Sequence, residues 1–255
     1  MRARDYAYFD GPTPTGLAHR GGAAYHPNLG IENTIAAFRQ AVDMGYRYLE
    51  TDVHATRDGI VVAFHDDHLD RVTDTAGRIA DQPYAAVRGA LIGGREAVPT
   101  LAELLEEFPE TRVNIDIKAD QALGPTLELI RRMGVIDRVC IGSFSERRLR
   151  AARRALFPRL ATSAGQVGVG ALRLAPQPLS RLLHTPAPAL QIPMEHKIRG
   201  RLIPLATREV VSVAHRLGKH VRVVPFVVHR GCRPDAPAAG PRRRRDRHRP
   251  HRHPA

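Results

Sequence analysis

Short apolar runs alternate with segments of helical periodicity along most of the chain. Strands are predicted at residues 15–19, 48–54, 60–65, 112–118, 138–144, 159–163, 189–193 and 220–224. Helical spacing of apolar residues is found at 35–44, 100–105, 125–133, 146–156 and 207–217. Strands that alternate with helices of this length are typical of βα units and a parallel sheet. The eight strands therefore predict an α/β fold, a closed (β/α)8 TIM-type barrel.

Two segments depart from this alternation. Residues 66–99 are interrupted by glycines and prolines and contain little beyond a possible helix at 84–88, which predicts an insertion after the third strand. The last residues have no helix or strand period. We therefore expect a catalytic domain at 1–226 that includes the insertion at 66–99. An irregular, disordered Arg/Pro-rich tail is expected at 227–255.

Ionisable side chains gather where the predicted strands end. His19, Glu50, Asp52, His65 and Asp116 all lie at or near the C-terminal ends of their strands. In a barrel of this type these ends form one rim, and catalysis takes place there. The five groups are thus expected to share one site.

The three carboxylates at this rim suggest a metal site. Glu50 and Asp52 are two residues apart on a strand, so their side chains face the same side, and Asp116 would be a third ligand from a neighbouring strand. Oxygen ligands suit Mg²⁺ or Ca²⁺ rather than zinc. A lone carboxylate would more often form a salt bridge with a nearby Arg or Lys. Three on one rim repel one another, which favours a bound divalent cation.

The remaining rim residues suit phosphate chemistry. His19 and His65 are candidate proton carriers, because imidazole titrates near neutral pH. A lone His is more often structural, but two that face one cluster favour catalysis. Arg20 offers a bidentate fork to a phosphate oxygen, and Lys118 could neutralise charge on another. Glu32 either orients a catalytic His or begins a helix. Together these residues predict a metal-dependent phosphodiesterase.

The order of these motifs resembles the glycerophosphodiester phosphodiesterase family. The motifs are A-H-R-G-G at 18–22, E-N-T at 32–34, E-T-D-V-H-A-T-R-D-G at 50–59, V-A-F-H-D-D-H-L-D-R-V-T-D at 62–74, V-P-T-L-A-E-L-L at 98–105 and N-I-D-I-K at 114–118. The resemblance covers about residues 17–224. It implies a TIM-type barrel with an insertion after the second catalytic His. The implied reaction is hydrolysis of glycerophosphodiesters to sn-glycerol 3-phosphate and an alcohol.

The resemblance also implies roles for single residues. His19 and His65 would be the general acid and base, Arg20 would bind phosphate, and Glu50, Asp52 and Asp116 would hold the metal. Many members of the family carry Glu where this chain has Asp116, so the shorter side chain could shift the cation. An alternative enzyme class is the related sphingomyelinase D-like phosphotransferase group, which shares the plan of two His and three carboxylates. Its secreted members usually carry a signal and disulfides, neither of which is visible in this sequence.

Charge and composition limit the classes of partner that this chain is expected to bind. The formal net charge of the 255 residues is +13, and about half of the excess lies from Arg230 onward. This arginine run lacks interleaved aromatic residues or a nucleic-acid-binding fold, so a small-molecule substrate is favoured over nucleic acid. No apolar run approaches the roughly 18 residues of a membrane span, and no secretory signal is visible. A cytoplasmic protein with two free thiols, Cys140 and Cys232, is expected.

The basic tail permits a second interpretation. Reading codons 238–251 one base later permits the peptide Leu-Leu-Asp-Leu-Gly-Val-Asp-Gly-Ile-Val-Thr-Asp-Arg, which resembles the closing helix–turn–strand of the same family. Our hypothesis is that the tail is a frameshifted C-terminus, which the nucleotide sequence of the gene would test. A chain without its last barrel strand would expose two sheet edges. The alternative to an active enzyme is therefore an inactive or unstable relative.

Overall fold

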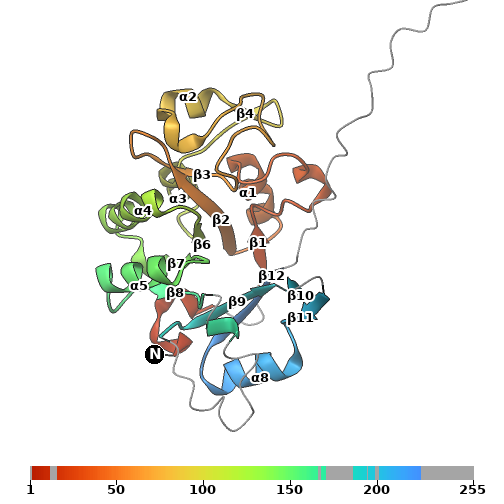
Figure 1. The fold of residues 1–255 in the computed structure, drawn as a ribbon, viewed down its shortest axis with the longest axis vertical. Coiled ribbons are helices and arrows are strands. Elements are labelled where there is room, and N and C mark those ends of the chain that lie inside the picture. Colours follow the sequence, from red (N-terminus) through yellow and green to blue (C-terminus); the bar gives the residue numbers. More distant parts are fainter. Residues whose placement is uncertain are drawn as a thin grey trace, which may run out of the picture.

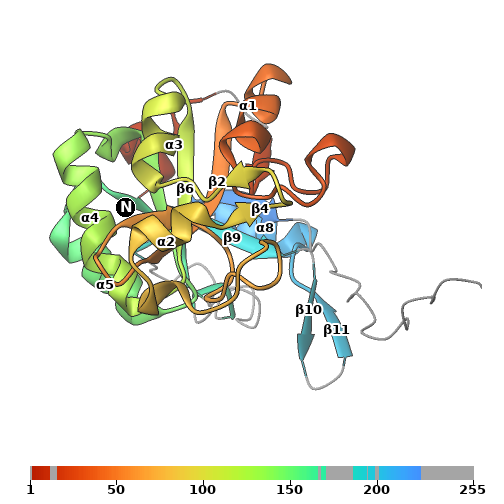
Figure 2. The same ribbon diagram turned by 90° about the horizontal axis from the view of Figure 1, so that it is seen from above.

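The computed structural model describes residues 2–11, 16–165, 168–170, 186–193, 195–198 and 201–224, and two views of it are given in Figures 1 and 2. The predicted tail at 227–255, which the frameshift hypothesis concerns, lies outside these residues. Cys232 also lies outside them. Within them, the expected α/β architecture with a mostly parallel sheet is confirmed.

Parallel strands form the centre of the molecule. The main sheet has the order β1-β2-β6-β7-β8, with all neighbours parallel along this path. A parallel bridge between Ser163 and Ala189 continues it to β9, which pairs in parallel with β12. The bounds are β1 Leu17–His19, β2 Tyr48–Ala55, β6 Arg112–Ile117, β7 Val139–Gly142, β8 Ala161–Thr162, β9 Ala189–Pro193 and β12 His220–Val224.

One of the eight predicted parallel strands runs in the opposite direction. β3 (Val61–Ala63) pairs antiparallel with the end of β2, with Val53 opposite Ala63. The reason is the short connection, in which Gly59 takes a φ of +80° and donates its N–H to the Thr56 carbonyl. Such a turn can close a hairpin, whereas a parallel pair needs a crossover of about a dozen residues or more. The prediction of a parallel strand at 60–65 was wrong.

The predicted helices are all present and cover the sheet. Four of the five have a side-chain N-cap that accepts a backbone N–H, namely Thr34 in α1, Thr100 in α3, Ser145 in α5 and Thr207 in α8. Figure 1 shows α3, α4 and α5 following one another along the outside of the main sheet, while α8 lies with β9 and β12. The bounds are α1 Ile35–Asp43, α3 Leu101–Glu107, α4 Asp120–Met133, α5 Glu146–Ala155 and α8 Arg208–Arg216.

The start of α4 differs from its prediction. The helix begins at Asp120, and Pro125 lies inside it rather than at its first position. Proline is favoured in a first turn because it lacks an N–H, so sequence reasoning placed the start there. In the structure α4 continues through the proline at the cost of one backbone hydrogen bond. It ends where Gly134 adopts a φ of +66°.

The insertion at 66–99 has its own small core. Its helix is confirmed as α2 (Tyr84–Gly89), and it also contains a hairpin of β4 (Leu91–Ile92) and β5 (Glu96–Ala97), which the sequence did not predict. Figure 1 places this unit at the opposite end of the molecule from α8. Its buried apolar cluster consists of Val62, Phe64, Leu69, Ile79, Val87, Ala90, Ile92 and Val98. The insertion is therefore a packed unit that is held against β3.

A second unpredicted hairpin, β10 (Glu195–Ile198) with β11 (Arg201–Pro204), follows β9. Single 3-10 turns complete the described elements at Ala3–Asp5, Ala7–Phe9, His26–Asn28, Ile79–Asp81 and Ile136–Arg138. The first two pack aromatic rings against Tyr48 and Cys140, whose thiol is buried and free as predicted. In the part of the chain that is described, no helix combines the length and apolar character that a bilayer crossing requires.

Candidate active site

The strand register brings most of the predicted rim residues together. His19 ends β1 opposite Glu50 of β2, and Asp52 of β2 lies opposite Asp116 of β6. Because these strands are parallel and adjacent, their C-terminal ends meet at one edge. Arg20 follows β1 and Lys118 follows β6 by one residue each, so both side chains also lie at this rim.

Lys118 sits between two of the predicted metal ligands. Its Nζ lies 2.8 Å from Asp52 Oδ1 and 2.8 Å from Asp116 Oδ2. Burial opposes ionisation of both Lys118 and Asp52. Asp116 and Asp52 nevertheless raise the pKa of Lys118, and Lys118 and Arg20 hold the pKa of Asp52 below its usual value. The ammonium group thus holds a positive charge between the two carboxylates.

Glu50, the third carboxylate, is unfavourable as an ion in this arrangement. Burial raises its pKa well above the usual value, and the charges of Asp52 and Asp116 raise it further. Its Oε2 accepts a hydrogen bond of 3.0 Å from the Arg20 backbone N–H and lies 3.8 Å from His19 Nε2. Three carboxylates that repel one another in a buried site are the arrangement that a cation relieves.

The carboxylate oxygens of the three acidic residues suit a hard divalent cation. Lys118 already places one positive charge between Asp52 and Asp116. The side-chain geometry is not that of a closed metal centre. Among the residues that the structure describes, no three of the types His, Cys, Asp and Glu converge closely enough to hold an ion. A cation held by Glu50, Asp52 and Asp116 would therefore need a different arrangement of Lys118 and these carboxylates.

Arg20 is held by the turn that follows β1. Its φ of +50° is followed by Gly21 and Gly22 at +75° and +79°, and a Cβ at Gly21 would lie 3.0 Å from the Phe38 backbone nitrogen. The guanidinium donates from Nη1 to Glu32 Oε1 at 3.2 Å, and its buried Nε lies 3.1 Å from Asp52 Oδ2 without a hydrogen bond. A non-glycine residue in this region is strained, which is common at functional sites.

The two imidazoles have different surroundings. Burial, followed by the positive charges of Arg20 and Lys118, lowers the pKa of His19 to about 4, although Asp52 and Glu32 act to raise it. His65 is partly exposed, and its Nδ1 lies 2.5 Å from Asp66 Oδ1. The Phe64 backbone N–H donates to the Asp52 carbonyl at 2.9 Å, so the antiparallel β3 returns His65 to the rim. His54 of β2 contacts the His65 carbonyl through Nε2 at 3.1 Å.

Glu32 contacts arginines rather than an imidazole. Besides Arg20, its Oε1 accepts a hydrogen bond of 2.5 Å from Arg71 Nη2. Arg71 also donates from Nε to Asp66. Helix α1 is capped by Thr34, so neither of the two expected roles of Glu32 describes these contacts.

Sequence reasoning did not single out Asp66, Arg71 or Asn33. Asn33 is buried, has a φ of +60° and donates from Nδ2 to Asp52 Oδ2 at 3.3 Å. The position of Asp66 directly after His65 was the available signal, because a carboxylate beside an imidazole is a common orienting pair. Arg71 gave no such signal, since its partners come from two separate segments.

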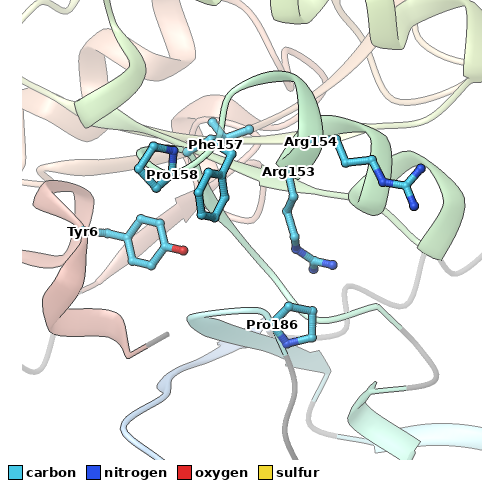
Figure 3. A pocket seen from close by; sticks show the side chains of 7 residues that line it. Tyr6, Arg153, Arg154, Phe157, Pro158 and Pro186 are labelled. Atoms are coloured by element: carbon cyan, nitrogen blue, oxygen red, sulfur yellow. The ribbon is translucent and has the colours of Figure 1, made fainter.

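Two pockets in the described part of the chain lie away from this rim. Figure 3 shows one of about 440 Å³ whose walls include Tyr6, Arg153, Phe157 and Pro186. A second, of about 360 Å³, is lined by Ile35 and three glutamates of α3. Neither contains any of the rim residues described above, so we assign the site from the side chains and their charges.

Comparisons with known proteins identify the family of this chain. The model of the Glycerophosphoryl diester phosphodiesterase family matches residues 19–192. "Probable glycerophosphodiester phosphodiesterase 2" of Mycobacterium tuberculosis is 45% identical over 58% of this chain and 55% of its own length. A glycerophosphodiester phosphodiesterase of Caldanaerobacter subterraneus subsp. tengcongensis is 34% identical over 54% of this chain and 61% of its own. The chain thus spans a little over half the length of these curated relatives.

Solved structures show the same fold. An Oleispira antarctica phosphodiesterase in complex with the product sn-glycerol-3-phosphate matches with a TM-score of 0.64 at 24% identity, over 83% of this chain and 84% of that one. A glycerophosphodiester phosphodiesterase from Thermotoga maritima matches with a TM-score of 0.61 at 22% identity, over 82% and 84%. The predicted TIM-type barrel is confirmed, and the chain belongs to the glycerophosphoryl diester phosphodiesterase family.

Proposed function

We propose that this protein hydrolyses glycerophosphodiesters to sn-glycerol 3-phosphate and an alcohol. The observation that carries the proposal is the gathering of His19, Arg20, Lys118 and three carboxylates at the C-terminal edge of adjacent parallel strands. This set supplies positive charge for a phosphate beside groups that transfer protons. Membership of the family and the product complex of the Oleispira relative support the choice of substrate.

The residues that we propose for the cation are Glu50, Asp52 and Asp116. A Mg²⁺ or Ca²⁺ ion held there would polarise phosphorus and neutralise charge on a phosphate oxygen. Arg20 and Lys118 are the groups of this chain that would bind the remaining phosphate oxygens, because both are cationic and partly buried at the rim. Glu32 supports the site by fixing the guanidinium of Arg20.

We assign the base to His19 and the acid to His65. With a pKa lowered to about 4 by burial, His19 is neutral near pH 7 and can accept a proton at Nε2 or Nδ1. Asp66 occupies Nδ1 of His65 and leaves Nε2 of that ring to donate a proton to the leaving group.

The proposed reaction is a single displacement at phosphorus. The attacking water molecule loses a proton to His19 as its oxygen bonds to phosphorus. The bond from phosphorus to the headgroup oxygen breaks, and His65 donates a proton to the departing alkoxide. Both proton transfers avoid free hydroxide and free alkoxide, which is the gain from general acid–base catalysis.

The test is release of sn-glycerol 3-phosphate from several headgroup diesters by the purified chain. We expect release with added Mg²⁺ or Ca²⁺ and its loss with a chelator. Undiminished release in chelator would overturn the role of the cation. No release from any diester by a folded chain would overturn the proposed reaction.

A further inference from the structure

Arg71 connects two parts of the candidate site that come from different segments. It lies in the insertion, where no catalytic or binding role was expected. Its Nη2 donates to Glu32 Oε1 at 2.5 Å, its Nη1 donates to Glu32 Oε2 at 3.4 Å, and its Nε donates to Asp66 Oδ2. One guanidinium therefore holds both carboxylates.

Each of these carboxylates contacts a proposed functional side chain. The other oxygen of Asp66 lies 2.5 Å from His65 Nδ1, and Glu32 Oε1 accepts a hydrogen bond of 3.2 Å from Arg20 Nη1. The result is a continuous chain of contacts from His65 through Asp66, Arg71 and Glu32 to Arg20. Charges alternate along it when His65 is protonated, so each member stabilises its neighbours.

The backbone that carries Arg71 is firmly held. Leu69 is fully buried in the core of the insertion, and its N–H donates to the Gly77 carbonyl at 3.0 Å. Thr73 donates its N–H and its hydroxyl to the Leu69 carbonyl. It also forms a β-bridge with Ile92 of β4. Arg71 lies between Leu69 and Thr73 in the sequence, so its backbone is held in place on both sides.

We propose that Arg71 is a positioning residue that aligns the acid His65 with the phosphate-binding Arg20. The insertion thereby acquires a role, since its packed core supplies this connection. The proposal rests on the proposed function for its kinetic consequence, but the contacts themselves can be tested without turnover. Arg71 does not need to touch the substrate, so its effect would pass through Asp66 and Glu32.

A lysine would hold these two carboxylates less well than the arginine does. Asp66 and Glu32 contact different nitrogens of one planar fork, whereas a lysine would have to reach both carboxylates from a single nitrogen. We expect Arg71→Ala to lower kcat/KM about 10²-fold, because small misplacements of catalytic groups cost about this much. Arg71→Lys should recover only part of the loss. Arg78→Ala is the matched control, since Arg78 lies in the same insertion and, among the residues that the structure describes, forms an ion pair only with exposed Asp67, at 4.0 Å.

A double-mutant cycle separates positioning from general damage. If Arg71 acts through Asp66, the combined loss in Arg71→Ala with Asp66→Asn will be clearly smaller than the product of the single losses. Thermal unfolding of each variant controls for stability. Independent losses that multiply, or an Arg71→Lys variant as active as wild type, would overturn the proposal.

The second readout is the His65 ring in proton NMR of the full chain without substrate. The Nδ1 proton that is shared with Asp66 should give a downfield resonance in wild type and Arg78→Ala. We expect it to shift or disappear in Arg71→Ala. An unchanged resonance would overturn the inference, whereas a wild-type chain that shows it but hydrolyses no diester would overturn only the proposed function.

Discussion

At the scale of single residues, the two imidazoles of the site are distinguished by burial. His19 is held neutral near pH 7 by burial and Arg20, while His65 is partly exposed beside Asp66. Such opposite surroundings are how proteins divide acid and base roles between groups of one chemical type.

This division makes a prediction with two substrates. His65→Ala should slow cleavage of an alkyl headgroup diester about 10²- to 10⁴-fold, because the leaving alkoxide then lacks its acid. A p-nitrophenyl diester needs little protonation, so the same variant should retain most of its activity towards it. His19→Ala should lose activity towards both. The assay is initial rate for each substrate, and the opposite pattern would exchange the two roles.

Lys118 gives a second residue-scale prediction. Lys118→Met removes the ammonium group that lies between Asp52 and Asp116. Leaving a buried charge without its partner costs about 3–5 kcal/mol of folding stability. The variant should melt at a lower temperature than wild type without divalent ions. Added Mg²⁺ or Ca²⁺ should raise its Tm by more than it raises that of wild type, as followed by circular dichroism. An equal shift in both would argue against a cation at these carboxylates.

Much of the site was predictable at this scale, because its residues share strand ends and strand ends share a rim. That rule alone was enough to predict that four residues lie together, namely His19, Glu50, Asp52 and Asp116. Arg71 was not predictable, because its partners Glu32 and Asp66 lie on segments whose approach depends on how the insertion packs.

At the scale of elements, the insertion determines how firmly Arg71 is held. Leu69→Ala should cost about 2–5 kcal/mol, since Leu69 is fully buried in the insertion core. It should also lower kcat/KM by loosening Arg71. Leu29→Ala is the matched control, because Leu29 is 58% exposed and such changes stay within about 0.5 kcal/mol. Urea unfolding measures both variants, and equal costs would contradict the packing described.

Sequence patterns found helices more reliably than strand directions. Apolar spacing identified α1, α5 and α8, because each buries one face. β3 was mistaken for a parallel strand, because its apolar residues are the same in either direction and only the short turn at Gly59 determines the pairing. The hairpin of β4 and β5 has strands of two residues each, which are too short for a detectable period.

At the scale of the whole molecule, acid stability depends on buried histidines. Burial and then Arg222 lower the pKa of His220 to about 4, while the unfolded value is 6.5. Between pH 6.5 and 4 the unfolded chain therefore binds more protons, and the free energy of unfolding falls as pH falls through this window. In His220→Gln this fall should be shallower. Urea titrations across the window test this, and parallel pH curves would contradict it.

The overall fold was predictable because alternation of strands and helices leaves few arrangements. The contacts of Arg222 were not predictable. Its buried guanidinium lies against the rings of Tyr8, Phe9 and Tyr48, which come from segments far from it in the sequence. No local pattern indicates such a contact.

The most direct test of the account compares sn-glycerol 3-phosphate release by wild type and by the His19→Ala/His65→Ala double variant. Both are assayed with the same diester and cation, after circular dichroism has shown the same fold. We expect release by wild type and none above background by the variant. Release at the wild-type rate by the folded double variant would contradict the claim that this rim is the active site.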